Sequence, residues 1–195
     1  MSDVRTLTLA DAALPRTGAL QQVLLVVGAS IVTGLAAQVE IRIPGLLVPI
    51  TGQTFAVLLT GAVLGARRAF AAQLLYLGEG ALGLPVFAGG AGGVLVFAGP
   101  TAGYLAAFPL AAAATGALAE RGWDRRFVTM LLAMLAGSAI IFAGGLAVLS
   151  RFVPREALLS QGLLPFIPGD LIKSSLAALA FPFAWRWARR DGTGV

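Results

Sequence analysis

Long runs without charged residues alternate with short, arginine-bearing segments along the 195-residue chain. A helix needs about 20 apolar residues to cross the hydrocarbon core of a bilayer. Six stretches reach or approach this length once proline and glycine breaks are taken as helix boundaries. The pattern predicts transmembrane helices at residues 20–39, 49–66, 69–84, 101–119, 127–150 and 168–185.

Two further regions fall outside these helices. Residues 1–19 are polar enough to form an aqueous tail or a short surface helix, and they lack the apolar core and cleavage pattern of a signal peptide. Residues 85–99 carry no charge but are rich in proline and glycine, so we expect a non-helical segment there. The chain is therefore predicted to be a single domain over residues 1–195, an all-α integral membrane protein built as a compact bundle of six transmembrane helices.

Composition supports the membrane interpretation. Hydrophobic residues make up 58% of the chain and charged residues 12%, and the mean hydropathy is +0.88. A soluble domain is about 45–50% apolar and about 25% charged. These values exclude a soluble enzyme, a disordered chain and a small secreted domain held by disulfides.

Missing residue types exclude several chemistries. The chain has no cysteine and no histidine, so we expect no metal site, no cofactor and no catalytic site built on a thiolate or an imidazole. Its single lysine, Lys173, follows Ile172, which excludes a Walker A loop. The chain is thus not its own ATPase.

Basic residues are unevenly divided between the two ends of the predicted helices. Three arginines fall at one end, while ten fall at the end that holds both termini: Arg5, Arg16, Arg67, Arg68, Arg121, Arg125, Arg126, Arg186, Arg189 and Arg190. Because cytoplasmic loops of membrane proteins are enriched in basic residues, both termini are predicted to be cytoplasmic. Arginines spaced between apolar runs do not form a nucleic-acid-binding face, so no nucleic acid is expected as a partner.

The predicted outer loops are long, apolar and rich in proline and glycine. They cover residues 42–49, 85–99 and 151–169. Non-helical backbone near membrane depth is tolerated only where protein or a cavity covers it. These loops are therefore predicted to roof a ligand pocket that faces outward.

Two charged residues lie close together at the start of the last predicted helix. Asp170 and Lys173 are three residues apart, which places them on one helical face. One interpretation is a self-neutralising pair whose lysine reaches the interface. The other is a pair of ligand-binding groups, because a charge at bilayer depth costs several kcal/mol and is a functional candidate.

Other polar and small residues allow two interpretations each. Glu79 and Gln53 either hydrogen-bond a neighbouring helix or face the ligand. Ala29, Thr33 and Ala37 form a stripe of small residues that packs either inside the bundle or against another protein. The Gly61-x-x-x-Gly65 sequence is predicted to be a helix-packing motif.

Several motifs in order resemble one known family over residues 20–185. They are Val48-Pro-Ile-Thr-Gly-Gln-Thr54, Leu64-Gly-Ala-Arg-Arg68, Gly83-Leu-Pro-Val-Phe-Ala-Gly-Gly90, Gly99-Pro-Thr-Ala-Gly-Tyr-Leu105 and Pro168-Gly-Asp-Leu-Ile-Lys173. In this order and spacing the set resembles the BioY family, the biotin-binding S components of energy-coupling-factor (ECF) vitamin transporters.

The resemblance implies a function and a binding site. It implies high-affinity capture of biotin in a bacterial or archaeal cytoplasmic membrane, with Asp170 and Lys173 in the ligand site. Biotin offers a carboxylate for an ammonium group and ureido N–H donors for a carboxylate. The other substrate-binding candidates are Glu79, Gln53, Phe87, Gly89, Gly90 and Tyr104.

The resemblance also implies partners. The family works with a transmembrane T component and two cytosolic ATPases, which alone use ATP. Docking in the family uses an Ala-x-x-x-Ala pattern on the first helix, whereas here the registers are Ala29-x-x-x-Thr33 and Thr33-x-x-x-Ala37.

Two alternatives remain open from the sequence. A stand-alone carrier for biotin or another vitamin could couple to protons through Glu79. An intramembrane enzyme would need Glu79 and Asp170 to meet across the bundle.

Overall fold

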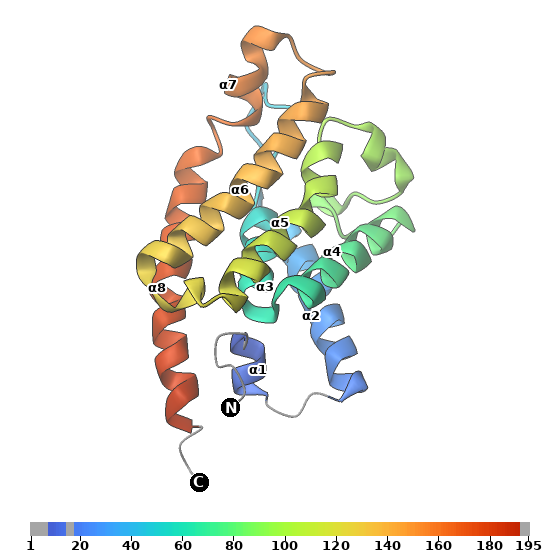
Figure 1. The fold of residues 1–195 in the computed structure, drawn as a ribbon. Helices are drawn as coiled ribbons and strands as arrows, with labels where there is room; N and C mark the ends of the chain where they lie inside the picture. Colours follow the sequence, from blue (N-terminus) through green and yellow to red (C-terminus); the bar gives the residue numbers. More distant parts are fainter. Residues whose placement is uncertain (1–7, 15–17, 192–195) are drawn as a thin grey trace.

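The computed structural model describes residues 8–14 and 18–191, with side chains as far as residue 188. Arg5 and Arg16, and the side chains of Arg189 and Arg190, lie outside the described residues. The described chain is almost entirely helical (Figure 1). Its α-helices are α1 (Leu9–Ala13), α2 (Ala19–Gln38), α3 (Gln53–Leu64), α4 (Ala66–Ala81), α5 (Ala102–Glu120), α6 (Phe127–Leu149), α7 (Leu158–Gly162) and α8 (Ile167–Asp191).

Short elements connect the long helices. Two two-residue strands, β1 (Glu40–Ile41) and β2 (Ile50–Thr51), pair antiparallel between α2 and α3. The described residues also form four 3₁₀ turns: η1 (Ala88–Gly90), η2 (Val94–Ala98), η3 (Trp123–Arg125) and η4 (Arg155–Ala157). The β1–β2 hairpin was not part of the predicted all-α fold. Strands of two residues are too short to leave an alternating pattern in the sequence.

Helix α5 is the centre of the bundle, packed by α3, α4 and α6, while α2 packs on α4 and α8 on α6. Small residues let these helices approach closely. A Cβ atom added at Gly61 of α3 would lie 2.6 Å from the Ala112 carbonyl of α5, and one at Gly103 of α5 would lie 2.1 Å from the Gly144 carbonyl of α6. The prediction that Gly61 belongs to a packing motif is confirmed.

The bundle has two distinct ends. At the first, which we call the α1 end, Asp11 of α1 pairs with Arg68 of α4 at 2.6 Å, and the Trp185 indole of α8 donates to Asp124 of η3. At the opposite end, the cavity end, lie the β1–β2 hairpin, the 82–101 segment and α7 (Figure 1). The last turns of α8 lie at the α1 end (Figure 1).

Four helical stretches are long and apolar enough to cross a membrane among the described residues: Ala19–Gln38, Ala102–Glu120, Phe127–Leu149 and Arg155–Ala188. The predicted span at 49–66 corresponds to a shorter helix of 12 residues, α3, and the span at 69–84 corresponds to α4, a helix of 16 residues. Helix α4 begins three residues before its predicted start and includes both arginines of the turn. Its first N–H group, on Ala66, is capped by the Glu120 carboxylate of α5 at 2.9 Å, a long-range contact that local pattern does not reveal.

The remaining boundaries differ less from the predicted spans. Helices α2, α5 and α6 match their predicted boundaries within one residue, whereas α8 extends six residues past the predicted end. The 85–99 segment, predicted to be non-helical, contains the two 3₁₀ turns η1 and η2.

Asp124 at the α1 end predicts a pH dependence of stability. Burial raises the pKa of this carboxyl from 3.8 to about 6, although the hydrogen bond from Trp185 opposes the shift. The folded chain then holds the Asp124 proton more tightly than the unfolded chain, so stability decreases as pH rises from about 4 to about 6. We expect Asp124→Asn to weaken this dependence, measured as unfolding temperature in detergent across that range. Glu156→Gln, at an exposed site, is the matched control, and an unchanged pH profile in Asp124→Asn would contradict the assignment.

Candidate functional site

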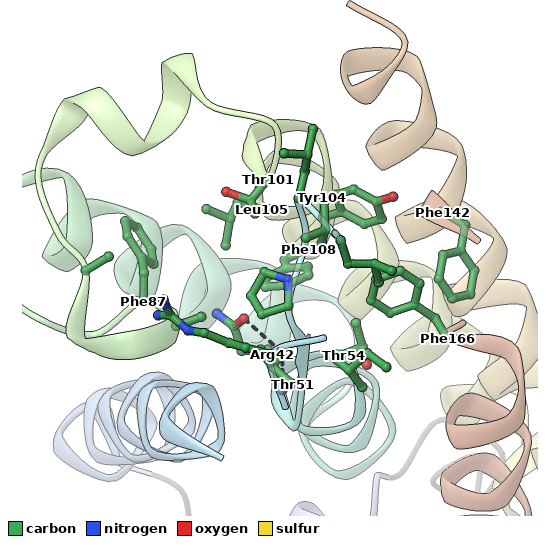
Figure 2. A pocket seen from close by; sticks show the side chains of 18 of the residues that line it. Arg42, Thr51, Thr54, Phe87, Thr101, Tyr104, Leu105, Phe108, Phe142 and Phe166 are labelled. Atoms are coloured by element: carbon green, nitrogen blue, oxygen red, sulfur yellow. Dashed lines mark hydrogen bonds between the residues drawn. The ribbon is translucent and has the colours of Figure 1, made fainter. Parts of the chain in front are cut away.

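A cavity of about 290 Å³ opens at the cavity end of the bundle. It lies between the β1–β2 hairpin, the first turn of α3, the 82–101 segment, and helices α5, α6 and α8. Figure 2 shows Phe142 and Phe166 on one side, Phe87 on the opposite side, and Arg42 and Thr51 between them. The cavity is thus formed by segments far apart in the sequence, with mainly apolar walls and several polar side chains, as is typical of small-molecule sites.

Two groups of opposite charge line the cavity from the first turns of α8. Asp170 accepts a hydrogen bond on Oδ1 from Ser138 Oγ of α6 at 2.8 Å. Lys173 donates from Nζ to the backbone carbonyl of Thr51 at 2.9 Å. Asp170 and Lys173 therefore each hydrogen-bond a third residue and not one another. The carboxylate keeps free acceptor positions and the ammonium group keeps free donor positions for a ligand.

An aromatic wall stands on the α5–α6–α8 side of the cavity. The Phe166 ring lies 6.3 Å from the Tyr104 ring and 6.2 Å from the Phe142 ring, measured between centroids. The Tyr104 hydroxyl donates to the Gly162 carbonyl of α7 at 2.7 Å, which fixes this ring. Such a wall is suited to an apolar ring or alkyl chain.

The opposite wall is formed by Phe87 and Gln53. The Phe87 side chain is buried, with its ring edge-on to Tyr76 and Phe97. It rests on Gly80 of α4, where a Cβ atom would lie 2.0 Å from the ring. The Gln53 side chain accepts from Thr51 Oγ1 at 3.0 Å and donates to the Tyr76 hydroxyl.

Arg42 lies where the two loops that cover the cavity meet. Its Nε lies 2.7 Å from Glu40 Oε1, forming an ion pair on the hairpin. A Cβ atom at Gly89, whose φ is +66°, would lie 2.1 Å from an Arg42 guanidinium nitrogen and 3.2 Å from Glu40 Oε1. Glycine adopts this backbone conformation without strain and leaves room for the guanidinium group beside it. The hairpin and the 82–101 segment therefore lie side by side at Arg42 and Gly89.

Most of the predicted site residues converge. Asp170, Lys173, Gln53, Phe87 and Tyr104 all line the cavity.

Gly89 and Gly90 lie outside the cavity lining. Gly89 lies against Arg42, and the Gly90 N–H donates to Gln38 Oε1 at 3.1 Å.

Glu79 also lies outside the cavity lining. It accepts a hydrogen bond from Ser30 of α2, so it links α2 to α4, as the neighbouring-helix interpretation expected. It does not meet Asp170, which removes the geometry that an intramembrane enzyme would need.

The small-residue stripe faces the interior, which corrects its predicted docking role. Ala29, Thr33 and Ala37 are buried, at 6%, 0% and 0% exposure. Thr33 Oγ1 donates to the Ala29 carbonyl and accepts from Gln73 Nε2 of α4 at 3.1 Å. Because Gln73 is fully buried and needs partners, the polar member of the stripe is turned toward α4 and away from the surface.

Several residues of the site escaped prediction. Arg42 appeared only as a marker of the outer boundary, and Ser138, which supports Asp170, is a lone serine within an apolar helix. An isolated hydroxyl in such a helix is the signal that could have found Ser138. Phe108, Phe142 and Phe166 carry no distinguishing signal among the chain's 11 phenylalanines.

Comparison with known proteins places the chain in a family. Residues 7–190 match the model of the BioY family. The chain belongs to the BioY family. The resemblance noted in the sequence is thereby confirmed.

Several members of the BioY family are similar to the chain over most of their length. A biotin transporter BioY of Rhizobium etli is 38% identical over 165 residues, covering 80% of this chain and 88% of the relative. A probable biotin transporter BioY of Pyrococcus horikoshii is 39% identical over 147 residues, covering 75% and 85%. The biotin transporter BioY of Thermotoga maritima is 43% identical over 141 residues, covering 71% and 82%.

One solved structure shares the fold. It is the crystal structure of the S-component for biotin from an ECF-type ABC transporter, with a TM-score of 0.72 and 24% sequence identity. The match covers 92% of this chain and 96% of the solved one. The chain therefore shares the fold of that S-component.

Proposed function

We propose that this protein binds biotin in the cavity and serves as the substrate-capture subunit of an ECF-type importer. The observation that carries the proposal is the convergence of Asp170 and Lys173 at a cavity with aromatic walls. Biotin has a carboxylate and ureido N–H groups that need charged or polar partners, while its ring and alkyl chain need an apolar surface. The relatives above are named transporters, in agreement with the prediction that the chain is not an enzyme.

The proposal includes a membrane topology. Helices α2, α3, α4, α5, α6 and α8 form the six membrane-spanning elements, of which α3 and α4 are the shortest. The α1 end carries Arg67, Arg68, Arg121, Arg125, Arg126 and Arg186, so it is cytoplasmic by the charge rule. The cavity end then faces outward, with the hairpin and the 82–101 segment as its roof.

Energy for uptake comes from partner subunits in this proposal. The chain lacks a Walker A loop, so a transmembrane T component and two cytosolic ATPases would supply ATP hydrolysis. Because Ala29, Thr33 and Ala37 are buried, these partners would dock on another surface of the chain.

Equilibrium binding of labelled biotin to the detergent-purified chain tests the function. We expect saturable binding that unlabelled biotin displaces. Uptake into cells that express the chain with and without an energising module then distinguishes an S subunit from a stand-alone carrier. Uptake that persists without the module and stops when the proton gradient is dissipated would favour the carrier.

The position of Arg42 between the roof loops predicts an effect on the rate at which biotin dissociates. Arg42→Ala removes the side chain that lies between the hairpin and Gly89 and pairs with Glu40, so we expect the two roof loops to separate more often. We expect labelled biotin to dissociate about tenfold faster, with a smaller change in association rate, because affinity changes appear mostly in dissociation. Arg151→Ala, an exposed arginine outside the cavity lining, is the matched control. Equal dissociation rates in wild type and Arg42→Ala would contradict this role.

A further inference from the structure

A line of hydrogen bonds joins the 82–101 segment to α8 through residues beside the cavity. The Tyr76 hydroxyl of α4 donates to the Val86 carbonyl at 3.1 Å and accepts from Gln53 Nε2 of α3. Gln53 Oε1 accepts from Thr51 Oγ1 at 3.0 Å, and the Thr51 carbonyl accepts from Lys173 Nζ at 2.9 Å. We call these five residues the Tyr76 relay.

The direction of each hydrogen bond in the Tyr76 relay follows from the chemistry of its ends. The Val86 carbonyl can only accept, so it takes the single hydroxyl proton of Tyr76. The Tyr76 oxygen can then only accept a hydrogen bond from Gln53, and only the amide nitrogen of Gln53 can donate it. If the amide turned over, its oxygen would face a hydroxyl whose proton is already committed to Val86. Tyr76 therefore directs the Gln53 oxygen toward Thr51.

Tyr76 supports three cavity-lining residues without lining the cavity itself. Its side chain is fully buried. Besides its bond to Gln53, its ring meets the Phe87 ring edge-on at 5.4 Å and stacks on the Phe108 ring at 6.5 Å. Gln53, Phe87 and Phe108 come from α3, the 82–101 segment and α5, so one side chain connects three walls of the cavity.

We propose that Tyr76 is a positioning residue of the binding site, which fixes the orientation of the Gln53 amide and tethers the Val86–Phe87 backbone to it. This inference rests on the proposed function, since biotin is the ligand whose binding it affects. The tether itself is a property of the ligand-free chain, and it can be measured there. Removing the hydroxyl should both free the Gln53 amide to turn over and loosen the roof segment.

Binding by a double-mutant cycle tests the positioning role. Tyr76→Phe keeps both ring contacts and removes only the hydroxyl, while Gln53→Met removes the amide at similar size. We expect each variant to bind biotin at least about tenfold more weakly, because the Gln53 amide that lines the cavity is either no longer held in one orientation or absent. If Tyr76 acts through Gln53, the double variant should be no more than about twofold weaker than the weaker single variant. Independent, multiplying losses, or wild-type affinity in Tyr76→Phe, would overturn the proposal.

Two further measurements separate positioning from simple loss of stability. Thr115→Val removes another buried hydroxyl, on α5 and away from the cavity lining, and it should lower the unfolding temperature without changing affinity. Amide hydrogen exchange of the ligand-free chain should accelerate at residues 86–91 in Tyr76→Phe and in Gln53→Met, and unchanged exchange in both would overturn the tether. If the wild-type chain bound no biotin, the proposed function would fall while the exchange result still decided the tether.

Discussion

Replacing Lys173 by methionine is expected to weaken biotin binding by about 30-fold or more. Methionine keeps the length of the apolar stem but removes the ammonium group, which donates to the Thr51 carbonyl and lines the cavity. Truncating one member of a desolvated charged pair costs about 2–5 kcal/mol, and about 1.4 kcal/mol corresponds to a factor of ten. Asp170→Asn should also reduce affinity, because it keeps the oxygen that accepts from Ser138 but removes the charge.

Both variants are measured by equilibrium binding of labelled biotin to the detergent-purified chain. Arg155→Ala and Glu156→Gln are the matched controls, since they remove a positive and a negative charge at exposed sites of the loop before α7. Their affinities should equal that of wild type. Unchanged affinity in Lys173→Met and Asp170→Asn together would show that the two charges serve only to neutralise one another.

The charged part of the site could be predicted from sequence because charge is costly in an apolar helix. Asp170 and Lys173 stand out against their surroundings, and the cost of burying them demands an explanation. The aromatic wall could not be predicted in the same way. Phe142 and Phe166 come from different helices, and a phenylalanine facing the cavity has the same local sequence pattern as one facing lipid.

The fold shows a similar division between local and long-range information. The ends of α2, α5 and α6 follow from charge and glycine or proline breaks near the helix boundaries. The start of α4 depends instead on Glu120, which lies 54 residues away from the N–H group that it caps. The direction of the small-residue stripe likewise depends on Gln73, whose amide needs the Thr33 hydroxyl inside the bundle. A stripe of small residues alone fits both the interior and a partner surface.

Gly61→Leu is expected to destabilise the bundle by about 3 kcal/mol or to prevent folding. A Cβ atom at this position would lie 2.6 Å from the Ala112 carbonyl and 3.3 Å from its Cα atom, so α3 and α5 would have to separate. Backbone cannot rotate away as a flexible side chain can, and overpacking in a close-packed interior costs about 1–3 kcal/mol, occasionally more.

The measurement for Gly61→Leu is thermal unfolding in detergent, with Gly78→Leu of α4 as the matched control. Both changes replace a helical glycine by leucine, but a Cβ atom at Gly78 would meet nothing within 4 Å. Leucine has the higher helix propensity, so Gly78→Leu should unfold at the wild-type temperature or above it. The contrast isolates the cost of the α3–α5 crossing from the intrinsic effect of the substitution. Equal unfolding temperatures for the two variants would mean that α3 can move away from α5 at little cost. The first turn of α3, which carries Gln53 to the cavity, would then not be held in place by this crossing.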